Sequence, residues 1–348
     1  MSNEIKVNIE FLKQLKEIID LMVQITEHDK IKEWKDKIDK LELSQSDIKV
    51  SNIKSNNIKR ELINYAEETI NGIACNKHKW ACKRFLDDLK DKNLFFDEEE
   101  VRRVYEWATH LHHIVGPLAG ENIELNDISK FVIGNIYGLK YVSTGQRKYN
   151  KAYYSTARNN NNTTLSKIIA TYEAQKNNLV CIKGIGLYSI IAEELSKYFG
   201  NDFFISKRKK NILNKNREEI ITAKLNDEQL YECICIDELY DISEKQLEYY
   251  YKISNGILFI TTTISNMKEY KKVTDICTGL KRDDRYFILV CEADEEDLMD
   301  IKESIIKANP IYEKSSKYFN EQYEWFKKRN DLKAYNKQVL NRMKQEIQ

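Results

Sequence analysis

Six short apolar runs, separated by helical patterns, constrain the fold of this chain more than any other feature of its sequence. The runs occupy residues 152–155, 179–182, 203–205, 233–236, 257–261 and 286–291. Several are continuously apolar, as strands are when both faces of their sheet are covered. Helical patterns lie between them, for example over 164–174 and 189–199, as the crossovers of a parallel sheet require. We therefore predict an α/β core at 150–312, with a mostly parallel sheet flanked by helices.

The regions on either side of this core have the 3.6-residue apolar period of amphipathic helices. We predict a helical extension with a polar linker at 1–58, a helical region packed on the core at 59–149, and a helical C-terminal segment at 313–348. One expected helix covers 97–113. The acidic residues Glu98, Glu99 and Glu100 in its first turn suit the positive end of a helix dipole.

Composition narrows the functional classes. The 348 residues carry a net charge of +1, so bulk charge does not indicate a nucleic-acid-binding protein. The seven cysteines lack metal-ligand spacing, and Cys233 and Cys235 should lie on one face of a strand as small buried residues. The odd cysteine count and the lack of a leader sequence indicate the cytoplasm. No apolar stretch approaches the ~18 residues that a membrane span needs.

The segment 156–163 lies between a predicted strand and a predicted helix, which is the arrangement of a phosphate-binding loop. It contains four consecutive asparagines and ends on Thr163, at the opening of the helix. Such a loop turns backbone N–H groups and a helix N-terminus toward an anion. The Gly-Lys pair that normally precedes the threonine is absent. An Asn-rich turn that caps the helix is the alternative interpretation.

Two acidic residues, Asp237 and Glu238, follow the apolar run 233–236 and form a Walker B pattern. In this pattern the Asp holds Mg²⁺ through water, and the Glu orients and deprotonates the attacking water. The alternative is a strand end followed by an N-cap Asp. Three threonines at 261–263 end the next strand, where a hydroxyl-bearing segment can sense the γ-phosphate. Ordinary β-branched strand residues are the alternative there.

Read in order, several segments resemble the ATPase half of the large terminase family of tailed phages. The resemblance covers about residues 60–335, through the segments 64–75, 79–89, 96–99, 116–120, 130–138, 236–239, 260–263 and 307–310. It implies a P-loop NTPase-like fold with added helices at both ends. It also implies ATP and Mg²⁺ as ligands, and double-stranded DNA, a small terminase subunit or a portal as partners.

The resemblance further implies roles for individual residues. It assigns Glu238 and Arg158 to catalysis, and Asp237 and Thr163 to the metal. The other assigned positions are the nucleotide-binding residues Asn161, Asn162, Thr163, Thr164 and Ser129, and the coupling residues Thr261, Thr262 and Thr263.

The sequence departs from the family at positions that matter for catalysis. Asn161 stands where the family's loop has Gly, Asn162 where it has Lys, and Ser129 where it has the adenine-reading Gln. Asn adopts positive φ more readily than any residue but Gly, so Asn161 should keep the shape of the loop. Asn162 is uncharged and too short to reach the β- and γ-phosphates. The chain also ends near where the family's nuclease domain would begin.

These residues leave three functions open. The first is a hydrolysis-defective terminase-like protein that binds ATP and Mg²⁺ weakly or not at all, and that acts by binding DNA or packaging partners. The second is an active DNA-packaging ATPase without its own nuclease. The third is a nucleotide-free structural adaptor.

Two further clusters have simpler interpretations. The histidines His110, His112 and His113 are predicted to cap a helix or pack in the core rather than bind a metal. The basic run at 207–210 is predicted to be a solvated loop, with contact to a DNA backbone as the alternative.

Overall fold

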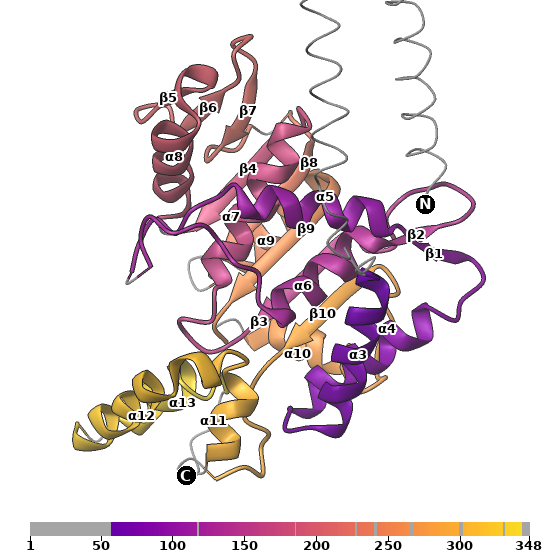
Figure 1. Ribbon diagram of the computed structural model, residues 1–348, viewed down its shortest axis with the longest axis vertical. Coiled ribbons are helices and arrows are strands. Elements are labelled where there is room, and N and C mark those ends of the chain that lie inside the picture. The colour runs from indigo at the N-terminus through magenta and orange to yellow at the C-terminus, as the bar shows by residue number, and fades with distance from the viewer. Residues whose placement is uncertain are drawn as a thin grey trace, which may run out of the picture. The chain divides into compact units, whose positions relative to one another are not determined.

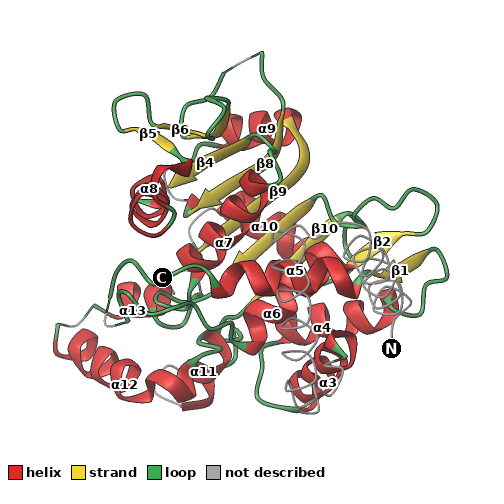
Figure 2. Cartoon of the chain, turned by 45° about the horizontal axis from the view of Figure 1, so that its top comes forward, coloured by secondary structure: helices red, strands yellow, loops and turns green. Residues whose placement is uncertain are grey.

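The predicted sheet is present, with five parallel strand pairings and two antiparallel pairings at one end (Figures 1 and 2). The computed structural model describes residues 57–342, except positions 117, 185, 227, 240–241, 265–266, 299–301 and 330. The strand order is β10-β3-β9-β8-β4-β7-β6-β5. The strands span Lys151–Ser155 (β3), Val180–Gly184 (β4), Phe204–Ser206 (β5), Asn211–Leu213 (β6), Glu219–Thr222 (β7), Tyr231–Asp237 (β8), Ser254–Thr262 (β9) and Tyr286–Val290 (β10).

All six predicted strands are found, as β3, β4, β5, β8, β9 and β10, but the prediction was incomplete at one end of the sheet. Strands β6 and β7 were not predicted, and they join β5 in an antiparallel meander. Both strands are short and partly polar, so no apolar run marks them in the sequence. Only their hydrogen bonds to neighbouring strands identify them. A separate two-stranded sheet, β1 (Leu94–Phe96) and β2 (Leu139–Tyr141), was missed for the same reason.

Helices cover both faces of the sheet, which explains the continuously apolar strands. On one face Cys233 and Cys235 pack in a cluster with residues of α7 (Asn162–Gln175), as predicted from their spacing. The alternate residues Ile234 and Ile236 face a second cluster on α9 (Glu244–Ile253) and α10 (Met267–Cys277). This alternation with period two is the expected geometry of a strand that is buried on both sides.

The region 58–149 shares its core with the first face of the sheet, so it packs as part of one compact unit that begins at Asn57. Its helices are α3 (Ile58–Asn71), α4 (Asn76–Asp88), α5 (Glu98–Thr109) and α6 (Asp127–Ile133), followed by a π-helical turn at Gly134–Gly138. Figure 1 shows α3 and α4 near β10, at the end of the sheet opposite β5. The helix predicted at 1–45 and the linker at 44–57 lie outside the described residues, apart from Asn57 itself.

The predicted helical segment at 313–348 contains α12 (Tyr312–Lys328) and α13 (Leu332–Gln338), but residues 339–342 are not helical. Helix α11 (Lys302–Ala308) precedes α12 and was not predicted. Helix α8 (Leu187–Tyr198) follows β4, where the helical pattern at 189–199 was noted. A small cluster that includes Ile305, Phe326 and Leu340 holds this end together. Within the described part of the chain, every helix is too short or too polar to cross a bilayer.

The prediction of a helix to residue 113 was wrong by one turn. Helix α5 ends at Thr109 because the following N–H groups find other acceptors. The His112 N–H donates to the carboxylate of Glu194, at 3.0 Å to Oε1 and 3.1 Å to Oε2. The His112 ring stacks on Tyr198 with 3.4 Å between ring centroids. The three histidines therefore do not share a helix, and the described residues contain no cluster of three or more metal-ligating side chains.

A buried ion pair joins α7 to α8 beneath this turn. Lys167 Nζ donates to Glu194 Oε2 at 2.6 Å, and the two side chains are 2 % and 0 % exposed. Lys167 Nζ also donates to the backbone oxygen of His112. Because α7 follows the segment 156–161 directly, this pair fixes the helix whose N-terminus forms the candidate site.

We expect Lys167→Met to lower the free energy of unfolding by about 3 kcal/mol, because it leaves the Glu194 carboxylate buried without its cation. Lys176→Met is the matched control. Lys176 pairs with Glu100 at 3.1 Å near the end of the same helix, but it is 38 % exposed, so its loss should be within about 1 kcal/mol. Urea unfolding of both variants measures the difference. Equal losses would show that the buried pair contributes no more than the exposed one.

Candidate nucleotide site

The strand order brings the predicted site residues to one edge of the sheet. Strand β9 lies between β3 and β8, and all three run parallel, so their carboxyl ends meet. In this register Ser155 pairs with Thr262, and Asp237 pairs with Thr261. The chain leaves β3 toward β4 on one side, while β10 lies on the other side of β3. Ligands of open α/β sheets bind where the strand order diverges in this way.

The segment 156–161 contains two left-handed residues despite its lack of glycine. Asn161 has φ 62° and ψ 20°, which is the left-handed conformation predicted for it, and Asn159 has φ 65°. Helix α7 begins immediately afterwards, at Asn162. The first N–H groups of a helix have no acceptor within it, so this turn presents donors and a positive dipole end to an anion.

The side chain at the lysine position is turned into the loop. Asn162 is buried, and its Oδ1 accepts a hydrogen bond from Thr156 Oγ1 at 2.7 Å. Asn160 is also buried, and its Nδ2 donates to the backbone oxygens of Ala157 and Arg158 at 3.0 and 3.1 Å. The interior of the loop is therefore filled by its own amide side chains, and the amide at position 162 adds no positive charge to the crevice.

Asp237 is the centre of the hydrogen bonding at this edge. Thr163 Oγ1 donates to Asp237 Oδ2 at 2.8 Å, and Thr261 Oγ1 donates to Oδ1 at 2.8 Å. The hydroxyl of Ser166 lies 2.9 Å from that of Thr261. Burial raises the pKa of Asp237, and the two threonine hydroxyls only partly oppose this. The predicted proximity of Thr163 and Asp237 is confirmed.

The oxygen atoms of Thr163 and Asp237 fit a magnesium ion. Mg²⁺ prefers oxygen ligands and keeps several waters, so one carboxylate and one hydroxyl from the protein suffice when phosphates supply the rest. Their assignment to the metal stays a prediction, as does the assignment of Asn161, Asn162 and Thr164 to the nucleotide. Thr164 is half-buried in the first turn of α7.

Glu238 is held by the end of β9. Its Oε2 accepts from the Thr263 N–H at 3.0 Å, its Oε1 accepts from Thr263 Oγ1 at 3.2 Å, and Thr262 Oγ1 lies 3.4 Å from Oε2. Burial raises the pKa of Glu238, while hydrogen bonds from Thr263 and the positive charge of Arg158 lower it. Thr261 thus contacts Asp237, Thr262 and Thr263 contact Glu238, and the coupling role of the three threonines stays a prediction.

Two predicted site residues have a looser relation to this cluster. The side chain of Arg158 is exposed, and its backbone N–H donates to the oxygen of Gln338 at 2.9 Å. Ser129 is buried in the first turn of α6, where its N–H donates to Asn126 Oδ1 at 2.9 Å. Among the contacts described for Ser129, none is with the segment 156–163. Nucleotide binding at Ser129 therefore stays a prediction from the resemblance.

The sequence did not reveal several residues of the site. Thr156 and Asn160 shape the interior of the loop, and Ser166 supports Thr261. Asn309 and Asn341 reach the loop from the C-terminal region, at 2.9 Å to Asn160 and 3.0 Å to Ser155 respectively. Asn309 lies in the segment 307–310 that resembles the family, but its contact with Asn160 cannot be read from the sequence, and no local pattern marks Asn341.

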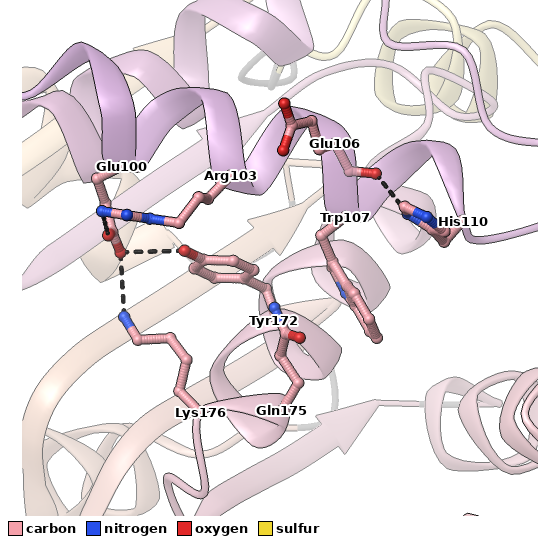
Figure 3. Close-up of a pocket in the computed structure, with 8 residues that line it drawn as sticks. All are labelled: Glu100, Arg103, Glu106, Trp107, His110, Tyr172, Gln175 and Lys176. Carbon is pink, nitrogen blue, oxygen red and sulfur yellow. Dashed lines mark hydrogen bonds and ion pairs between the residues drawn. The ribbon is translucent and has the colours of Figure 1, made fainter. Parts of the chain in front are cut away.

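A cavity of about 520 Å³ lies elsewhere, between α5 and the far end of α7 (Figure 3). Its lining residues are Glu100, Arg103, Glu106, Trp107, His110, Tyr172, Gln175 and Lys176. Lys176 Nζ and the Tyr172 hydroxyl both donate to Glu100 Oε1, at 3.1 and 3.2 Å. Tyr172, Gln175 and Lys176 lie at the end of α7 opposite Asn162, so the cavity is separate from the candidate site at Asp237.

Comparisons with known proteins agree with this fold. No protein-family model matches the sequence, and no curated protein matches it. Among solved structures, the crystal structure of the HK97 bacteriophage large terminase is similar, with a TM-score of 0.55 and 14 % sequence identity. The match covers 70 % of this chain and 55 % of that chain, so this chain spans about half the length of that terminase. The described region therefore has a terminase-like P-loop NTPase fold.

We expect Asp237→Asn to stabilise the protein near neutral pH by about 1 kcal/mol. The folded state raises the pKa of Asp237. Its contribution to stability is therefore greatest below the ordinary aspartate range and is lost as pH rises through the raised pKa. The asparagine removes the charge and keeps the shape, so the gain should shrink as pH falls toward about 4. Urea unfolding across this range measures it.

Asp97→Asn is the control, because the pKa of Asp97 is shifted in the opposite direction to that of Asp237. Burial alone would raise the pKa of Asp97, but Lys140 and the Glu100 N–H outweigh burial and hold the pKa below its ordinary value. This carboxylate stabilises the fold above the ordinary aspartate range, and that contribution is lost as pH falls. The asparagine still caps α5 but should destabilise the protein at neutral pH. A loss of stability in both variants would contradict the role of burial at Asp237.

Proposed function

We propose that this chain is a terminase-like protein of a DNA-packaging machinery that binds nucleotide weakly at 156–163 and hydrolyses it only at background rates. One observation carries the proposal: a loop of the right backbone shape beside Asp237 has a buried neutral amide, Asn162, in place of a cation. The fold supports the relationship to packaging motors. The retained carboxylates support residual binding of Mg²⁺ and nucleotide.

The lost cation affects hydrolysis more than binding. Phosphoryl transfer depends on positioning and on positive charge around the β- and γ-phosphates. A hydrogen bond that involves a charged group contributes about 1.5–3 kcal/mol net. If that contribution is lost in the transition state, the rate falls roughly ten- to hundredfold or more. The positive helix end and the Mg²⁺ ligands act on the ground state as well, so weak binding survives.

Arg158 and Ser129 affect two further properties of the proposed site, its positive charge and its selectivity for the base. The Arg158 side chain is exposed, and its charge reaches Glu238, so it leaves one positive group near the crevice. It would have to turn inward to contact a γ-phosphate. A serine in place of an adenine-reading glutamine offers one short hydroxyl to the base, so we propose that adenine and guanine nucleotides bind about equally.

Double-stranded DNA is the partner that this function implies, together with a portal or a small terminase subunit, in the cytoplasm of a bacterial host. The turn at 207–210 is the candidate DNA contact. Its four cations, Lys207, Arg208, Lys209 and Lys210, are all exposed at the tip of the β5–β6 hairpin, next to the edge strand of the sheet. Phosphate contacts need only such cations and no base recognition.

We expect the purified chain to release phosphate from ATP at background rates, with or without DNA. The reason is that position 162 offers a neutral amide where hydrolysis needs a cation. Asn161→Gly with Asn162→Lys should raise the affinity for Mg²⁺-ATP, because the glycine accepts the left-handed conformation and the lysine restores the charge. Phosphate release and equilibrium binding measure the two effects.

Glu238→Ala is the control for hydrolysis. A robust rate in the natural chain that disappears in Glu238→Ala would overturn the inactive interpretation and favour an active packaging ATPase. No nucleotide binding by either the natural or the restored chain would instead favour a nucleotide-free adaptor.

Neutralising the hairpin turn should weaken DNA binding without affecting the loop. For Lys207→Gln, Arg208→Gln and Lys209→Gln together, the slope of log affinity against log salt should fall by up to about 3, close to one unit for each lost phosphate contact. The control neutralises Lys83, Lys90 and Lys92, on and after α4, near the opposite edge strand. Equal slopes for the two triple variants would exclude the hairpin as the DNA contact.

A further inference from the structure

The last described residues of the chain, 339–342, are built into the carboxyl edge of the sheet. The Leu340 oxygen accepts from the Ala293 N–H at 2.9 Å. Arg342 Nη1 donates to the backbone oxygens of Asp294 and Asp297 at 2.9 and 2.8 Å. These partners follow β10 directly, so the segment is fixed where the sheet presents its candidate site.

Asn341 connects three strand ends through one side-chain amide. Its Oδ1 accepts from the Ile264 N–H at 2.7 Å, and its Nδ2 donates to Ser155 Oγ at 3.0 Å and to the Cys291 oxygen at 2.8 Å. Ser155 ends β3, Ile264 follows β9, and Cys291 follows β10. Asn341 is 0 % exposed. It also has φ 47°, a conformation that asparagine tolerates better than most residues.

The partners of Asn341 adjoin both halves of the nucleotide site. Ser155 precedes Thr156, whose hydroxyl holds Asn162 in the loop. Ile264 follows Thr263, whose N–H and hydroxyl hold Glu238. One amide therefore contacts the side chain of the residue before Thr156, which shapes the loop, and the backbone of the residue after Thr263, which holds the acid.

A second set of contacts joins the same C-terminal region to the loop. The oxygens of Ala308 and Gln338 accept from the N–H groups of Ala157 and Arg158, at 3.1 and 2.9 Å. Asn309 bridges the two parts, since its Oδ1 accepts from Asn160 and its Nδ2 donates to the Val339 oxygen at 2.8 Å.

We propose that Asn341 is a positioning residue of the nucleotide site, and that docking of 339–342 is linked to the geometry of the loop and of Glu238. Removal of a buried amide leaves the Ile264 N–H and the Cys291 oxygen without their partner, so the local structure opens more often. Anything that displaces the segment would loosen both halves of the site together. By reciprocity, a ligand that orders the site favours the docked segment. The link to nucleotide rests on the proposed function.

Hydrogen exchange of the full chain, without nucleotide, tests the positioning role. The variant is Asn341→Gly, because glycine accepts φ 47° and only the amide is lost. The control is Asn214→Gly, which removes another buried amide with three hydrogen bonds, in the turn between β6 and β7 and outside the C-terminal region. We expect exchange over 155–164 and 259–264 to rise about tenfold in Asn341→Gly and to stay within about twofold in Asn214→Gly.

The outcomes separate positioning from general stability. Thermal unfolding of both variants shows how far each lowers global stability, and α3 reports the global opening rate. If exchange at 155–164 and 259–264 rises in Asn341→Gly no more than exchange in α3 does, or if only one of the two segments responds, the positioning role is overturned.

A nucleotide arm distinguishes this inference from the proposed function. Mg²⁺-ATP should slow exchange at 156–163 in the natural chain, and Asn341→Gly should need about tenfold more of it for the same effect. If nucleotide changes nothing in the natural chain, the proposed function fails, while the nucleotide-free comparison still decides the role of Asn341. If nucleotide protects both chains at equal concentration, the proposed link between docking and nucleotide is wrong.

Discussion

Asp237 is a buried carboxylate that accepts hydrogen bonds from two threonines, and the arrangement of the site depends on it. Thr163 belongs to the helix that follows the loop, and Thr261 belongs to the strand inserted between the loop strand and the acid strand. A buried charge is costly unless its oxygens are paired. These two hydroxyls satisfy one oxygen each, and they fix the helix and the strand relative to each other.

The structure separates two properties that a phosphate-binding loop normally combines. The first is backbone shape, which asparagine supplies at 161 through its left-handed conformation. The second is positive charge, which asparagine at 162 does not supply. The amide also forms a hydrogen bond that a lysine would not form in the same way, with Thr156 inside the loop. The fold is thus retained with a neutral amide at position 162.

Residues far from the loop in the sequence hold helix α7 and the loop in place. The turn after α5 holds Lys167 of α7 through Glu194, and the C-terminal region holds the loop through Ala308, Asn309 and Gln338. One set of contacts holds α7 and the other holds the loop. The geometry of the site therefore depends on the whole compact unit and not on the sheet alone. The hydrophobic core is also continuous between 58–149 and the sheet, so the helices of this region help to fix the position of the sheet.

The sequence by itself determined the main strands, the loop at 156–163 and the two acids at 237–238, because each depends on residues that are adjacent in the chain. Apolar runs predict buried strands, and asparagine predicts positive φ, without knowledge of any partner. The strands β6 and β7, the early end of α5 and the contacts of Asn160, Asn309 and Asn341 were decided only by tertiary structure. In each case the partner is remote in sequence: Glu194 takes the N–H of His112, and Asn341 joins Ser155 to Ile264. A buried polar group must find a partner, but the sequence does not say which one, because that choice depends on the packing that brings distant segments together.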